Sequence, residues 1–282
     1  MKEFTAKVFD TDKYRLGESP FYNKALKRYS WVDIISNRHY VLQDDIKTCI
    51  DLGQPIGAAV PVKDSKAFVL AAMDGLYLED GENVTKIRDL TDTFKSYIRC
   101  NDAKADPEGR LFFGSSVADD HPAEGALYSF DHGKITCLQE NTKIANGMAW
   151  SKDKKTFYFA DSLEYGVLCY DYDAETGLIS NRRKLFEVVN GVPDGMCIDA
   201  DDNLWLAVWD GSRVEKRDGK TGELLGVIHV PAKHTTSCCF TEGNTLFITS
   251  SGEDLNGEFD GCLFTCEVDS VGPEPDGVKL PD

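Results

Sequence analysis

The stretch Pro193–Ala200 (PDGMCIDA), followed closely by Asn203–Val208 (NLWLAV), is the part of the chain on which the fold assignment depends. The second run is apolar throughout, and its length suits a strand that is buried on both faces. Asp194 and Gly195 stand shortly before it, on what we expect to be a tight turn. Since Pro-Asp-Gly is ordinary turn sequence, Asp194 becomes interesting only because the same layout recurs along the chain.

The layout recurs six times, as pairs of β-rich runs separated by turn residues. Each pair contains one large aromatic residue: Trp31, Phe68, Phe112, Phe157, Trp205 and Phe247. Their spacings are 37, 44, 45, 48 and 42 residues. A repeat of about 40–50 residues built from strand hairpins is typical of a β-propeller. The sequence therefore predicts an all-β fold, a six-bladed β-propeller with four antiparallel strands per blade.

The segments between the hairpins supply the outer strands of the predicted blades. Lys134–Gln139, Lys184–Val189 and Leu224–Val230 have the length and composition of such strands. The sequence contains neither a long amphipathic helix nor a recognisable linker. We therefore expect residues 1–282 to form a single propeller domain.

A second regularity lies about ten residues before each aromatic marker. The aligned positions are Glu18, Gly57, Asn101, Asn146, Asp194 and Thr236. The innermost strand of every blade runs beside the central channel, so residues at the start of these strands point towards one axis. Four of the six carry carboxylate or amide oxygens, the ligands that Ca²⁺, Mg²⁺ and Mn²⁺ prefer. The sequence thus predicts a metal site in the central channel, although Asn146-Gly147 alone looks like a turn.

Composition narrows the function classes. The chain has 31 basic and 48 acidic residues, a net charge of −17, which argues against nucleic acid or an anionic membrane surface as partner. Nine cysteines without a zinc-type spacing suit reduced thiols. Met1–Asp10 carries charges where a signal peptide needs an apolar core, and no run is long enough to span a membrane. We expect a cytoplasmic protein, a monomer or a weak homo-oligomer.

Several motifs resemble the senescence-marker-protein/regucalcin/gluconolactonase family, which includes luciferin-regenerating-enzyme-like proteins. The motifs are Gly17–Pro20, Trp31–Asp33, Arg99–Pro107, Asn146–Trp150, Ile179–Arg183, Pro193–Ala200 and Thr235–Phe240. The resemblance extends from about Tyr14 to about Val268. It implies a six-bladed propeller that hydrolyses sugar lactones at a divalent metal in its channel.

The resemblance also assigns roles to individual residues. It implies that Glu18, Asn146 and Asp194 hold one divalent ion (Ca, Zn, Mn or Mg), and that Arg99 and Asn101 contact the substrate. The ion would polarise the lactone carbonyl while Asp194 activates the attacking water. The guanidinium of Arg99 would bind hydroxyl groups through its planar fork.

The chain departs from the family pattern in two places. Ala103 replaces the glycine that often follows Asn-Asp. The family commonly places a second acid, usually Glu, beyond a Gly-Thr-Met segment, which corresponds here to Gly114–Ser116. Asp119 is the candidate for that substrate contact, and a solvated loop acid is its alternative role.

The predicted function is that of a metal-dependent lactonase that opens sugar lactones such as gluconolactone. One alternative is a non-enzymatic Ca²⁺-binding regulatory protein, and another is a metal-dependent esterase or phosphoesterase at the same site. A Ser-His-Asp hydrolase is not indicated, because the sequence lacks a Gly-x-Ser-x-Gly elbow. We expect His121 and His234 to be surface histidines, and Trp150 and Trp205 to be core residues.

Overall fold

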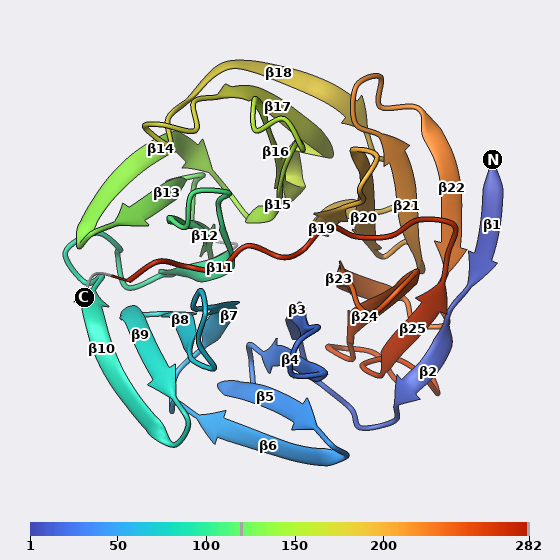
Figure 1. Ribbon diagram of the computed structural model, residues 1–282, viewed down its shortest axis with the longest axis horizontal. Coiled ribbons are helices and arrows are strands. Elements are labelled where there is room, and N and C mark those ends of the chain that lie inside the picture. Colours follow the sequence, from blue (N-terminus) through green and yellow to red (C-terminus); the bar gives the residue numbers. More distant parts are fainter. Residues whose placement is uncertain (119–120, 281–282) are drawn as a thin grey trace.

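The computed structural model of the protein describes residues 1–118 and 121–280. These residues form six sheets arranged as a ring around a central channel (Figure 1). The predicted all-β, six-bladed propeller with four antiparallel strands per blade is confirmed. In the described part of the chain, helical structure is limited to the 3₁₀ turn η1 (Ser162–Glu164), and no helix there is long and apolar enough to cross a membrane.

The blades are numbered one to six in chain order, and each contributes one innermost strand that borders the channel. The innermost strands are β3 (Gly17–Asn23), β7 (Ile56–Pro61), β11 (Ile98–Ala105), β15 (Ala145–Trp150), β19 (Val192–Ile198) and β23 (His234–Phe240). The second strands are β4 (Arg28–Asp33), β8 (Phe68–Ala72), β12 (Leu111–Val117), β16 (Thr156–Asp161), β20 (Asn203–Trp209) and β24 (Thr245–Ser251).

The outer half of each blade is a second hairpin. The third strands are β5 (Arg38–Gln43), β9 (Gly75–Asp80), β13 (Gly125–Asp131), β17 (Gly166–Tyr172), β21 (Arg213–Asp218) and β25 (Leu263–Glu267). The outermost strands of the first five blades are β6 (Ile46–Asp51), β10 (Asn83–Asp89), β14 (Lys134–Thr142), β18 (Ile179–Glu187) and β22 (Leu224–His229). The three segments predicted as outer strands overlap β14, β18 and β22.

The aromatic markers form the core between neighbouring blades. All six lie on second strands and are at most 1% exposed. Trp31 of blade one packs against Phe247 of blade six, with ring centroids 6.0 Å apart, and Trp205 of blade five packs against Phe240 of blade six at 5.9 Å. The repeat seen in the sequence is therefore the repeat of inter-blade packing.

The ring is closed by the N-terminus, which the sequence analysis did not predict. The strand β2 (Lys7–Asp10) pairs with β25 and supplies the outermost strand of blade six. The preceding strand β1 (Lys2–Thr5) adds a fifth, parallel strand to blade five, next to β22. Phe9 on β2 packs against Tyr29 and Phe247, with centroids 4.9 and 5.4 Å away, and so joins blade six to blade one.

The C-terminal segment crosses one face of the ring, over the channel, before it reaches blades two and three (Figure 1). Val278 forms a parallel bridge with Val62, and its backbone N–H donates to the carbonyl of Pro61 at 2.8 Å. The N–H of Lys279 donates to the carbonyl of Gly109 at 2.8 Å. This segment therefore covers the channel on the side where the innermost strands end.

Every innermost strand carries a β-bulge at the position aligned in the sequence analysis. The pairing register shifts between Glu18 and Phe21, Ile56 and Ala58, Cys100 and Ala103, Ala145 and Met148, Pro193 and Met196, and Thr235 and Ser237. A bulge adds an unpaired residue and re-aims the adjacent side chains. Six bulges at one level therefore form a ring of re-aimed side chains around the axis.

The interpretation of Asp194-Gly195 and Asn146-Gly147 as turns is wrong, because both pairs lie inside bulged strands. Glycine is needed there for close packing. A Cβ on Gly195 would lie 2.1 Å from Ser237 Oγ, and one on Gly147 would lie 2.6 Å from the carbonyl oxygen of Asp194. Asp-Gly and Asn-Gly suit tight turns and close-packed bulges alike, so local sequence does not separate the two.

Replacing Phe9 by Ala should destabilise the ring more than replacing Phe4, which is equally half-buried but lies on the additional strand β1. Removal of a packed phenyl ring at the closure should cost about 2 kcal/mol, equivalent to a fall in Tm of roughly 5 °C. Thermal unfolding followed by circular dichroism measures both variants. Equal losses would show that closure does not depend on Phe9.

Candidate metal and substrate site in the central channel

Three acid and amide side chains converge at the ring of bulges. Glu18, Asn146 and Asp194 come from blades one, four and five and are 7%, 4% and 5% exposed. The carboxyl group of Asp194 lies close enough to Glu18 and to Asn146 for both residues to shift its pKa. The structure thus brings together the three residues predicted as metal ligands.

Burial dominates the electrostatics of the two carboxyl groups. It raises the pKa of Glu18, and the charge of Asp102 raises it further. Burial also raises the pKa of Asp194, with additional contributions from the charges of Glu18 and Asp102. Two buried carboxyl groups in contact hold a shared proton unless a cation neutralises them. Burial therefore favours the neutral form of the pair, and a nearby cation would favour the charged form.

The amide of Asn146 has one atom held and one atom free. Its Nδ2 donates to Ser162 Oγ at 2.9 Å, and that hydroxyl donates to the carbonyl of Pro193, also at 2.9 Å. Its Oδ1 is buried without a hydrogen-bond partner. An unpaired buried acceptor is costly, and here it belongs to a residue whose amide interacts with the carboxyl group of Asp194. Two carboxylates and one amide oxygen are a donor set that fits Ca²⁺, Mg²⁺ or Mn²⁺.

Two further aspartates fix the strands that carry these ligands. Asp161 accepts hydrogen bonds from the backbone N–H groups of Lys143 and Ile144, both at 3.0 Å, directly before β15. Asp33 does the same for the two residues before Gly17, at 2.9 and 3.0 Å. In each of these two blades, an aspartate at the end of the second strand therefore fixes the backbone just before the innermost strand, β3 or β15.

Arg99 and Asn101 form a separate pair beside the acid cluster. One guanidinium nitrogen of Arg99 donates to Asn101 Oδ1 at 2.8 Å and to the carbonyl of Cys100 at 2.9 Å. The Nδ2 of Asn101 donates to the carbonyl of Ala145 at 3.0 Å. Asn101 therefore orients Arg99 through a hydrogen bond to its own Oδ1. The Oδ1 of Asn146, by contrast, has no partner. The predicted contact Asp119 lies outside the described residues.

The sequence analysis missed two channel residues, Asp102 and Lys104. Asp102 is 9% exposed, and burial raises its pKa. The ammonium of Lys104 donates to the carbonyls of Met148 and Met196, at 3.0 and 2.7 Å, and so links blades three, four and five. In a regular strand, neighbouring Asn101 and Asp102 would face opposite sides. The bulge in β11 is what lets both approach the channel.

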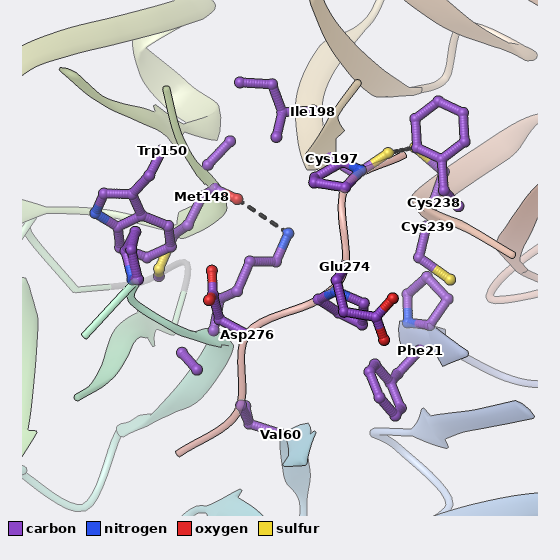
Figure 2. A pocket seen from close by; sticks show the side chains of 18 of the residues that line it. Phe21, Val60, Met148, Trp150, Cys197, Ile198, Cys238, Cys239, Glu274 and Asp276 are labelled. Carbon is purple, nitrogen blue, oxygen red and sulfur yellow. Dashed lines mark hydrogen bonds between the residues drawn. The ribbon is translucent and has the colours of Figure 1, made fainter. Parts of the chain in front are cut away.

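A cavity of about 430 Å³ continues the channel from the acid cluster towards the C-terminal segment. Its walls include Ser19 and Asp102, next in sequence to Glu18 and Asn101. Figure 2 shows Met148, Cys197 and Cys238 around it, with Glu274 and Asp276 of the C-terminal segment at its edge. The Sγ atoms of Cys197 and Cys238 are 3.6 Å apart, and all nine cysteines are free thiols. Most of the lining is apolar, so the polar chemistry lies at the ring of bulges.

Within residues 1–118 and 121–280, no three histidine, cysteine and acidic side chains lie close enough to hold an ion by themselves. An ion held by Glu18 and Asp194 would therefore take further oxygen ligands of another kind, such as the amide oxygen of Asn146.

Comparison with known proteins agrees with this geometry. Residues 16–252 match the family model described as SMP-30/Gluconolactonase/LRE-like region. The chain belongs to this family. It is 33% identical to regucalcin from Gallus gallus over 264 residues (88% of this chain, 87% of the relative), and 34% identical to regucalcin from Homo sapiens over 257 residues (86% of each). The family resemblance predicted from the motifs is confirmed.

Solved structures of family members have the same fold. A luciferin-regenerating enzyme aligns with a TM-score of 0.91 at 30% identity, covering 98% of this chain and all of that chain. A calcium-binding protein, regucalcin, from Agrobacterium tumefaciens aligns with a TM-score of 0.92 at 26% identity, covering 99% of each chain. Two further structures, titled as a gluconolactonase and a putative gluconolactonase, are 20% and 19% identical and share the fold.

Replacing Ser162 by Ala should weaken cation binding about tenfold, because the hydroxyl holds the amide of Asn146 in place. Calorimetric titration with Ca²⁺ measures the affinity. Ser115→Ala is the matched control: this serine is also fully buried, and its hydroxyl accepts the N–H of Ala126 at 2.9 Å, away from the cluster. A Ser162→Ala affinity equal to that of the control would contradict the positioning role.

Proposed function

We propose that this protein is a divalent-metal-dependent hydrolase that opens sugar lactones such as gluconolactone. The observation that supports it most is that the buried carboxyl groups of Glu18 and Asp194 interact with each other, and that Asn146, which interacts with Asp194, has an unpaired buried Oδ1. These three residues would hold the ion. The family membership of the chain agrees with this assignment.

A divalent ion bound there would act as a Lewis acid on the lactone carbonyl. Asp194 would accept a proton from the attacking water at a carboxylate oxygen, since it is the acid in contact with both other ligands. Arg99 would bind the hydroxyl groups of the substrate, because its guanidinium is held in a fixed direction by Asn101. Burial of the site would exclude bulk water from both contacts.

Asp194→Asn keeps the shape of the side chain but removes its charge and its basic oxygen. We expect lactone hydrolysis to fall by about 10³-fold or more, with an unchanged circular dichroism spectrum. A pH-indicator assay with gluconolactone, corrected for spontaneous opening, measures the rate. Asp201→Asn, an exposed acid seven residues further along, is the control and should retain activity. Full activity of Asp194→Asn would exclude the proposed role.

A second candidate is a Ca²⁺-binding protein without catalytic activity, favoured by the solved relative described as calcium-binding. A metal-dependent esterase or phosphoesterase would use the same residues. Of these three functions, the regulatory one predicts cation binding without turnover of any ester. The panel that separates them contains five- and six-membered aldonolactones, aryl esters and phosphoesters, each tested with Ca²⁺, Zn²⁺, Mn²⁺ and Mg²⁺.

Cation binding itself can be tested without substrate. Ligand at about 100 times its Kd stabilises a folded protein by about 2.7 kcal/mol, which should raise Tm by roughly 6 °C here. EDTA should reverse the rise. In Asn146→Ala the rise should be largely lost, because the amide oxygen is missing from the ligand set. Thermal shifts equal to those of the original protein would show that the ion binds elsewhere.

A further inference from the structure

Trp209 differs from the other tryptophans of the chain. Trp31, Trp150 and Trp205 are buried, whereas Trp209, at the end of β20, is partly exposed. Strand pairing places Trp209 opposite Val192, which comes two residues before Asp194. Since a strand rises about 3.3 Å per residue, Trp209 lies roughly 7 Å from the level of Asp194 along β19.

The direction of this displacement places Trp209 on the side of the site that lies away from the cavity. Residues that follow Asp194, from Cys197 to Ala200, line the cavity covered by the C-terminal segment. Residues that precede Asp194 therefore lie towards the opposite face. The same level is occupied by Arg99, two residues before Asn101, in blade three.

The partner of Trp209 is His234, which lies at this level in blade six, two residues before Thr236. The two rings stack with centroids 3.9 Å apart and planes at 13°. His234 is 8% exposed, so its expected place as a surface histidine is wrong, and its Nε2 pairs with Asp210 at 3.0 Å. Asp210, next to Trp209 in sequence, thus holds the histidine that stacks on the indole.

A substrate bound over the acid cluster would meet unlike surfaces on the two sides. The Trp209–His234 stack joins blade five to blade six, and these two blades stand opposite blades two and three, so the stack lies across the channel from the side that carries Arg99. Arg99 offers hydrogen-bond donors in a fixed direction, and a flat indole offers dispersion contacts to C–H groups. A sugar lactone presents hydroxyl groups on its edges and C–H groups on its faces, so it matches both.

We propose that Trp209 is a specificity-determining residue, which selects lactones whose hydroxylated carbon chain extends beyond the reacting ring. The proposal rests on the proposed function, because it places the carbonyl at the acid cluster. The level of Trp209 lies about 7 Å along the strand from that of Asp194. A lactone with a hydroxylated side chain is long enough to reach it, whereas a small unsubstituted lactone is not. His234 and Asp210 are positioning residues that hold the indole.

The test compares D-glucono-δ-lactone with γ-butyrolactone. Trp209→Ala should raise KM for gluconolactone about tenfold and leave kcat within about twofold, since the lost contact is remote from the carbonyl. kcat/KM for γ-butyrolactone should stay within about twofold. Trp209→Phe should keep most of the affinity for gluconolactone, because a flat ring remains. Trp150→Phe, a buried tryptophan away from this face, is the control for loss of an indole.

Two results would overturn the proposal while the lactonase function stands. One is an equal loss for both lactones in Trp209→Ala, which would mean a structural role. The other is unchanged KM values. If the original protein hydrolyses neither lactone, the proposed function fails. Titration with D-gluconate, followed by tryptophan emission, then tests directly whether the indole of Trp209 contacts a sugar acid. A saturable change that Trp209→Phe abolishes supports it; the same response in both proteins, or none, overturns it.

Discussion

The interaction between the buried carboxyl groups of Glu18 and Asp194 is the main electrostatic constraint on the central channel. A pair of this kind is costly when both groups are charged and no cation is present. Burial and the neighbouring charges favour the neutral form of both groups, and Asn146 adds a buried amide oxygen without a hydrogen-bond partner. A cation bound beside the pair would offset this cost, so we expect bound metal to stabilise the fold as well as to support activity.

This contact exists because a closed ring places the starts of six strands on one axis. The side chains are aimed by a β-bulge in every innermost strand, and the bulges need glycine where blades approach closely, as at Gly147 and Gly195. Closure in turn depends on β2, which lies at the opposite end of the chain from its partner β25. Phe9, far from the channel, packs between blades six and one at this closure.

The parts of this structure that repeat were predictable from the sequence, and the parts that occur once were not. Six spaced aromatic residues predicted the blades, because each fills the same inter-blade position. The strand β2 has no counterpart in the repeat, and its pairing is set only by ring closure. Asp102 and Lys104 were missed for a related reason: their partners lie on other blades, and strand alternation argued against their facing the channel. The roles of Glu18, Asn146 and Asp194 stay predictions.

Asn101 and Asn146 show why aligned positions do not imply equal roles. Both are buried amides at the bulge of an innermost strand. Arg99 donates a hydrogen bond to the amide oxygen of Asn101, whereas Ser162 accepts one from the amide nitrogen of Asn146 and leaves the oxygen of Asn146 unpaired. The neighbouring side chain thus decides the role of each amide oxygen. Next to Arg99 the oxygen orients a guanidinium, and next to Ser162 it stays available to a cation. Aligned residues of different blades therefore differ in function because their neighbours differ. The position of a residue in the repeat does not by itself predict its role.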